Sequence, residues 1–287
     1  MKIIFFGTPE YVIPILSKLA KSHEILAVVT QPPMPVGREQ FKKYSPVDDW
    51  AHKRNIPIFF DFDKPFPKAD LGVCAAYGKI IPKFVICPSA GGTGNLKFGI
   101  LNIHPSLLPK YRGASPIPAA ILAGDKETGV TIIKMDEKMD HGPIITQFTE
   151  DINPEDTADT LRNKLFERSA QVLIDLIPNY LKGKIKLKEQ NHDQATFTKV
   201  LTKQDGFIDL AGHQSPCLAG RQAITVHNFI RAMNPWPGAW TFINKKRLKI
   251  LKAHLENKEL ILDEVQLEGK NPVSWKQFKE AYPEFSF

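Results

Sequence analysis

Between residues 2 and 181 the chain alternates short apolar runs with longer stretches of helical spacing. This alternation is typical of an α/β fold, in which a largely parallel β-sheet carries helices on both faces. Ligands of such sheets bind beyond the carboxyl ends of the strands. We therefore look for chemistry in the loops after the first, fourth and fifth strands. The expected strands are 2–6, 25–30, 56–59, 71–76, 100–103 and 131–135, and the expected helices are 11–21, 46–55, 114–123 and 157–181.

The pattern changes after residue 181. Lysines alternate with Gly, Ile and Leu from 182 to 188, which favours an edge strand with one charged face. A polar stretch at 189–204 is followed by a helix and several short strands. We expect a first domain at 1–188, a linker at 189–204 and a small β-rich domain at 205–287. The expected elements of that second domain are a helix at 223–233 and strands at 239–243, 248–253 and 260–266.

Composition indicates an ordinary globular protein, with 43% hydrophobic and 24% charged residues. The cysteines (Cys74, Cys87 and Cys217) are odd in number and far apart, which favours a reducing compartment and no metal site. Because Met1 leads directly into an apolar strand, we expect a cytoplasmic protein without a membrane anchor. The net charge of +7 permits a polyanionic partner but does not require one.

Several common catalytic motifs are missing. Gly7 follows the first strand alone, whereas the dinucleotide fingerprint needs three spaced glycines. The glycines at 91–94 do not lie between a strand and a helix, and we interpret them as a flexible surface loop. No phosphate loop, Gly-x-Ser-x-Gly elbow or zinc spacing occurs. These absences argue against dehydrogenases, kinases, esterases and zinc hydrolases.

The densest polar group lies at the end of the fifth strand. Asn102 and His104 are two residues apart, so their side chains point to the same face. An amide donor beside an imidazole suits stabilisation of an oxyanion together with proton transfer. The alternative is that His104 is simply a hydrogen-bonded structural residue.

Two later segments add to this group. Asp140 lies in a turn-rich stretch after the sixth strand, where it is placed to orient and charge-stabilise His104, although Asp is also a common turn residue. The segment 106–113 contains proline and glycine, which favours a fixed turn with main-chain groups facing a ligand. A plain connecting loop is the alternative.

Taken together, these segments resemble the folate-dependent formyltransferase family. The core of the resemblance is 102–117 (NIHPSLLPKYRGASPI), followed by 128–131 (TGVT) and 139–143 (MDHGP). Flanking segments extend it over nearly the whole chain and resemble the branch of the family that acts on initiator tRNA. They lie at 6–10, 30–32, 37–38, 45–47, 76–82, 203–209, 230–239 and 265–270.

The resemblance implies a Rossmann-like formyltransferase domain followed by an OB-like C-terminal domain. It implies transfer of a formyl group from 10-formyltetrahydrofolate to the amino group of methionyl initiator tRNA, for translation initiation. We also expect a monomer that uses no metal. Asn102, His104 and Asp140 match the family's catalytic positions. The positions expected to contact folate are Ser106, Leu107, Leu108, Pro109, Tyr77 and Asp136.

Two departures from the family pattern stand out. The segment 91–98 is extra, and the chain after the Asn-Pro-Trp-Pro segment at 234–237 is short, as though two strands of the OB-like domain were missing. A shortened second domain weakens the case for tRNA, because the family holds tRNA with that domain.

Three basic groups nevertheless favour a nucleic-acid partner. Arg38, Lys42 and Lys43 lie where the resemblance places an acceptor-stem contact. Lys184 and Lys186 lie near the domain junction, and further basic residues cluster at 245–252. Phosphate contacts of this kind make affinity fall steeply with salt. The alternatives are a solvated surface loop and lysines that protect a sheet edge.

Other functions remain open at this level. A formyltransferase acting on a nucleotide-linked amino sugar would share the catalytic core, although the basic loop at 38–43 has no obvious use for a small acceptor. An RNA-binding protein that kept only the fold would not need the three catalytic side chains. A nicotinamide-dependent oxidoreductase lacks support because the glycine fingerprint is missing.

Overall fold

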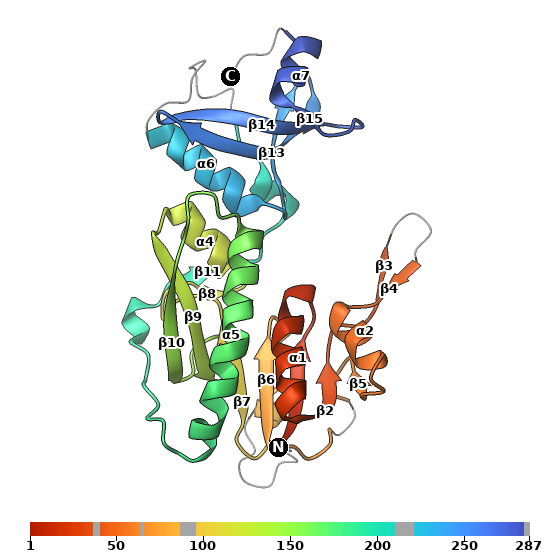
Figure 1. Ribbon diagram of the computed structural model, residues 1–287, viewed down its shortest axis with the longest axis vertical. Helices are drawn as coiled ribbons and strands as arrows, with labels where there is room; N and C mark the ends of the chain where they lie inside the picture. The colour runs from red at the N-terminus through yellow and green to blue at the C-terminus, as the bar shows by residue number, and fades with distance from the viewer. Residues whose placement is uncertain (37–40, 64–65, 87–95, 210–220, 284–287) are drawn as a thin grey trace. The chain divides into compact units, whose positions relative to one another are not determined.

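The computed structural model describes residues 1–36, 41–63, 66–86, 96–209 and 221–283 (Figure 1). The chain forms two compact units, and each unit combines segments that are distant in sequence. The first consists of Met1–Gly113, Gly129–Glu150 and Arg162–Phe197, and the second of Ala114–Thr128, Asp151–Leu161 and Thr198–Phe287.

A seven-stranded sheet, with strand order β10-β9-β7-β6-β1-β2-β5, organises the first unit. The pairs from β7 through to β5 are parallel, whereas β9 runs antiparallel to β7. The expected mostly parallel sheet is therefore confirmed, and β10 is a strand that the sequence pattern missed. The strands are β1 (Lys2–Gly7), β2 (Glu24–Val29), β5 (Ile58–Phe59), β6 (Leu71–Ala75), β7 (Ile100–His104), β9 (Glu127–Lys134) and β10 (Ile144–Asp151).

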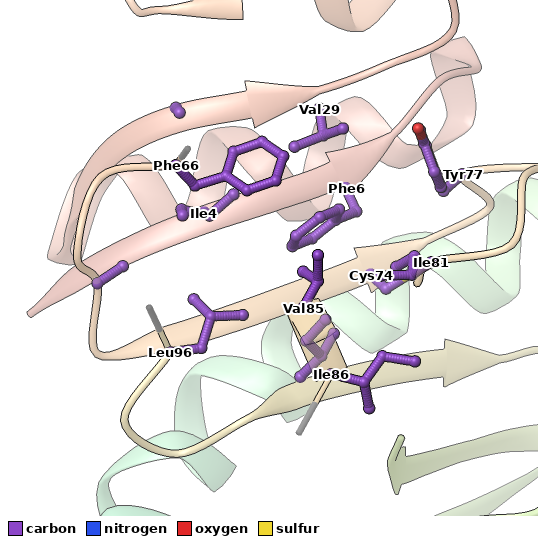
Figure 2. Packing of buried hydrophobic residues seen from close by; sticks show 13 residues of the cluster. Ile4, Phe6, Val29, Phe66, Cys74, Tyr77, Ile81, Val85, Ile86 and Leu96 are labelled. Carbon is purple, nitrogen blue, oxygen red and sulfur yellow. The ribbon is translucent and has the colours of Figure 1, made fainter. Parts of the chain in front are cut away.

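Both faces of the central strand are covered. Residues Ile3 to Phe6 of β1 are each at most 1% exposed, and successive side chains point to opposite faces. Figure 2 shows one of these faces, where Ile4 and Phe6 pack with Val85 and Ile86 of α3. The helices along this part of the chain are α1 (Ile13–Ser22), α2 (Pro46–His52), α3 (Lys83–Ile86) and α5 (Ala158–Leu181).

Local sequence explains where α2 begins. Ser45 is its N-cap, and its side-chain oxygen accepts a hydrogen bond from the main-chain N–H of Asp48 at 3.0 Å. Pro46 occupies the first helical position, where a missing N–H costs nothing. These two residues therefore start α2 at Pro46.

Smaller pairings correct two expectations. The basic loop after β2 contains an antiparallel hairpin of β3 (Met34–Val36) and β4 (Phe41–Lys43). The expected lysine-rich strand at 182–188 is wrong, because that segment is turn and irregular backbone with one isolated bridge between Lys188 and Ile144. A strand needs a continuous partner, and among the described residues only Lys188 has one there.

The second unit has an antiparallel sheet in the order β12-β13-β14-β15, as expected for a small β-rich C-terminal domain. Among the described residues β12 and β15 are its edges. β15 and the last helix were not expected from the sequence. The elements are α4 (Pro116–Ala123), α6 (Arg221–Met233), β12 (Ala239–Ile243), β13 (Lys246–Glu256), β14 (Glu259–Leu267), β15 (Val273–Ser274) and α7 (Trp275–Ala281).

Within the described part of the chain, the helices are too short or too polar to span a bilayer.

Candidate active site

Strand β7 carries the two polar residues singled out in the sequence. Asn102 and His104 lie at its carboxyl end, and both reach Asp140 in the loop between β9 and β10. The Asn102 Nδ2 donates to Asp140 Oδ1 at 3.3 Å, and His104 Nδ1 lies 3.5 Å from Asp140 Oδ2. The structure thus brings the three predicted catalytic residues into one group, and their catalytic role stays a prediction.

The imidazole of His104 is only 4% exposed and lies between two oxygen acceptors. Its Nε2 is 2.9 Å from the carbonyl oxygen of Tyr111, while its Nδ1 faces Asp140. A protonated ring donates to both acceptors, whereas the neutral Nε2–H tautomer donates only to the carbonyl. Because the Tyr111 carbonyl can only accept, Nε2 carries a hydrogen, and Nδ1 faces the Asp140 carboxylate.

The main chain around Asp140 is unusual. Asp140 has a φ of 47°, in the left-handed region that Asp tolerates better than most residues. Its Oδ2 accepts a hydrogen bond from the Gly113 N–H at 2.8 Å. Two residues later Gly142 passes so close to β9 that an added Cβ would lie 1.9 Å from the Lys134 carbonyl oxygen. Only glycine fits there, so the loop approaches the sheet closely.

A buried glutamine in the segment expected to be a linker holds this loop. The Gln190 Nε2 donates to the carbonyl oxygens of Asp140 and Gly142, each at 2.8 Å. Its Oε1 accepts from Arg112 Nη2 at 2.7 Å and from Nε at 3.2 Å. Sequence reasoning missed Gln190, because a single Gln in a polar stretch has no spacing signal and its partners are far away in sequence.

Further charged groups surround Arg112. Its Nη2 lies 2.8 Å from His192 Nδ1, and the His192 ring stacks on His141 with centroids 3.9 Å apart. His141 Nδ1 in turn lies 2.6 Å from Asp136 Oδ2. Burial lowers the pKa of Arg112. The pKa of His192 is also lowered, mainly by desolvation and to a smaller extent by His141 and Arg112 nearby. Asp136, expected to contact folate, thus also shapes its own loop.

Two side chains, Thr131 of β9 and Gln147 of β10, hold the turn expected to contact folate. Thr131 Oγ1 donates to the Ser106 carbonyl at 2.6 Å and accepts from the Leu108 N–H at 3.0 Å. Gln147 Nε2 donates to the Leu108 carbonyl at 3.0 Å. The segment from Ser106 through Leu107 and Leu108 to Pro109 is therefore a rigid turn beside His104.

Tyr77 lies beyond the carboxyl end of β6, as Figure 2 shows. Its carbonyl accepts hydrogen bonds from Thr8 Oγ1 and Gln31 Nε2, which ties together the loops after β1, β2 and β6. Its phenolic oxygen is buried and has no partner among the described residues. Burial raises the pKa of this phenol to about 12, with a smaller contribution from Cys74, so the group stays a neutral hydrogen-bond donor.

The residues expected to bind nucleic acid are exposed where they are described. Lys42 and Lys43 lie on β4, and Lys184 and Lys186 lie in the irregular segment after α5. Arg38 falls outside the described residues, as do the glycines at 91–94. No group of three metal-ligating side chains occurs within the described ranges.

Comparison with known proteins gives the same family that the motifs resemble. The family model described as formyl transferase matches residues 1–177, and the formyl transferase C-terminal domain matches 200–261. The methionyl-tRNA formyltransferase of Chloroflexus aurantiacus is 39% identical over 263 residues, covering 88% of this chain and 80% of that protein.

Solved structures share the fold at lower identity. A methionyl-tRNA formyltransferase from Clostridium thermocellum has a TM-score of 0.60 and 19% identity, over 93% of this chain and 98% of that one. An N-formyltransferase from Helicobacter canadensis, in complex with folinic acid and dTDP-3-aminofucose, has a TM-score of 0.68 and 19% identity. That match covers 96% of this chain and 98% of the other.

Proposed function

The chain belongs to the formyl transferase family, and we propose that it transfers a formyl group from 10-formyltetrahydrofolate to the amino group of methionyl initiator tRNA. The observation that carries the chemistry is the contact of Asn102 and His104 with Asp140 at the carboxyl end of β7. The acceptor is inferred from the relatives that share 37–39% of their residues with this chain over most of its length.

The three side chains divide the work of acyl transfer. Attack of an amine on a formyl carbon places negative charge on the formyl oxygen, and Asn102 and protonated His104 are the donors that stabilise it. Asp140 keeps the imidazole in place and stabilises its positive charge. His104 can then pass a proton to the folate nitrogen that leaves, and the proton that the attacking amine loses restores the imidazolium. Removal of one such donor typically costs about 3 kcal/mol of transition-state stabilisation.

Two features fit a folate at the same end of the sheet. The loop that carries Tyr77 lies beyond the carboxyl end of β6, and its main chain is held to the loops after β1 and β2. The rigid turn from Ser106 to Pro109 offers a fixed apolar and main-chain surface beside His104. We assign folate contacts to this turn, to Tyr77 and to the loop that begins at Asp136.

The basic surface supports a nucleic-acid acceptor. Lys42 and Lys43 are exposed on the hairpin after β2, where they suit contacts with the phosphates of a polyanionic acceptor. We assign the transfer chemistry to residues 1–188 and tRNA contacts to this hairpin (including Arg38), to Lys184 and Lys186, and to the domain at 205–287. We further propose that the protein acts in the cytoplasm and as a monomer.

The acceptor is tested by comparing the two candidate acceptors in the same assay. Formyl transfer is measured with methionyl initiator tRNA and with a nucleotide-linked amino sugar, each at two salt concentrations. Transfer to the tRNA that weakens as salt rises supports the proposal, because phosphate contacts are lost to competing ions. Transfer to the sugar alone would leave the chemistry intact but overturn the acceptor.

A further inference from the structure

The segment after α5 contacts Asp140 at one point and Tyr111, a hydrogen-bond partner of His104, at another, although the sequence presents it as a linker. Gln190 lies at one end of these contacts and Thr196 at the other. We call residues 190–196 the tether. We infer that the tether positions Asp140 and His104 for catalysis, with Gln190 and Thr196 as positioning residues that do not touch the substrates.

The first contact fixes the loop that carries Asp140. Both amide hydrogens of Gln190 go to loop carbonyls, and both lone pairs of its oxygen accept from Arg112. The amide can adopt only this orientation, because carbonyls only accept and a guanidinium only donates. Gln190 is 5% exposed, so its hydrogen-bonding capacity is used in full away from bulk water.

Arg112 and Gly113 also hold Asp140 in place. Arg112 donates to the Gln190 side chain, which in turn donates to the Asp140 carbonyl. The N–H of the next residue, Gly113, donates to the Asp140 carboxylate at 2.8 Å. The backbone and the side chain of Asp140 are therefore both held by the same dipeptide and the tether. A loop residue with a φ of 47° needs such support to stay in one conformation.

The second contact acts on His104. Thr196 Oγ1 accepts from the Tyr111 N–H at 2.8 Å, and the Thr196 carbonyl accepts from the Arg112 N–H at 2.8 Å. Tyr111 has a φ of 60°, a left-handed conformation that a bulky residue adopts only under constraint. The carbonyl of this constrained residue is the one that His104 Nε2 contacts. Thr196 therefore sets the position of a direct partner of the imidazole.

The chain offers a matched control for the hydroxyl of Thr196. Thr198 also accepts a hydrogen bond from a main-chain N–H, that of Ser115, at 3.0 Å. Ser115 is the N-cap residue of α4, a different segment from those that carry His104 and Asp140, and the two threonines are two residues apart. Valine in place of either threonine removes a hydroxyl that accepts a main-chain N–H, so a loss of stability is expected in both variants.

Steady-state kinetics then separate positioning from folding. We expect Thr196→Val to lower kcat about tenfold with both KM values nearly unchanged, since a small displacement of a catalytic group affects the chemical step. Thr196→Ser should restore turnover, and Thr198→Val should leave kcat at the wild-type value. Gln190→Glu, which keeps a partner for Arg112 but loses the two N–H donors, should also lower kcat. Equal kcat in the two valine variants, or a change confined to KM, overturns the inference.

The kinetic test of this inference rests on the proposed function. A second measurement therefore does not depend on turnover. The side-chain ¹⁵N chemical shift of His104 Nε2 reports its hydrogen bond to Tyr111. We expect this shift to change in Thr196→Val and not in Thr198→Val, and an unchanged shift in both overturns the inference. If the wild-type protein formylated neither acceptor, the proposed function would fail while the NMR comparison still decided on the tether.

Discussion

Gly142 offers a sharp test of how closely the Asp140 loop is fitted to the sheet. A Cβ at this position would lie 1.9 Å from the Lys134 carbonyl oxygen, and ordinary contact begins near 3.4 Å. In Gly142→Ala the loop therefore has to move by about 1.5 Å, because main-chain carbonyls of a strand yield little. The 2.8 Å bond from Gly113 to Asp140 cannot survive such a shift.

The expected loss follows from that displacement. A misplacement of about 1 Å can cost about a hundredfold in rate, which corresponds to about 2.7 kcal/mol of barrier. We therefore expect Gly142→Ala to lower kcat by at least about a hundredfold in formyl transfer assays. Gly183→Ala is the control, because its Cβ meets nothing within 4 Å and only backbone strain is added. A Gly142→Ala enzyme with kcat within about threefold of wild type would refute this reasoning.

Three further predictions address other parts of the site. Asn102→Ala should lower kcat by about 10²–10³-fold with little change in KM, as loss of an oxyanion donor does, and a change confined to KM in steady-state assays would contradict this role. The double variant Lys42→Ala/Lys43→Ala should raise KM for tRNA and flatten the dependence of log(kcat/KM) on log salt by up to about two units, and an unchanged slope would remove the hairpin from the acceptor surface. Burial raises the pKa of the Cys74 thiol to about 12. In a variant whose other cysteines are replaced by serine, we therefore expect almost no labelling by a thiolate-selective reagent at neutral pH until denaturant is added. Rapid labelling of the folded protein would contradict the buried position of Cys74.

The local pattern of β7 was enough to place two candidate site residues side by side. Asn102 and His104 alternate along a strand, so period-two geometry alone puts them on one face. Asp140 was a candidate partner of His104 from its place after the sixth strand, and the resemblance to the family supported that choice. Its position depends on a left-handed turn that single-sequence patterns do not specify. The mostly parallel sheet followed from the alternation of apolar runs with helical stretches.

Other features depend on contacts between distant segments. Alternating lysines suggested a strand at 182–188, yet strand formation requires a hydrogen-bonding partner, and one isolated bridge is present. Gln190 lies in a polar segment that reads as a linker, and its importance comes from partners 48–78 residues away. No propensity or spacing rule encodes such tertiary contacts.

The central claim is that the group formed by Asn102, His104 and Asp140 performs formyl transfer to methionyl initiator tRNA. Single-turnover transfer to that tRNA by wild type and by Asp140→Asn tests it directly, with tRNA affinity measured alongside. We predict a transfer rate lowered by about 10³-fold or more at unchanged affinity, because the variant cannot charge-stabilise protonated His104. A rate within a few-fold of wild type, or a loss of affinity that accounts for the whole effect, would contradict the claim.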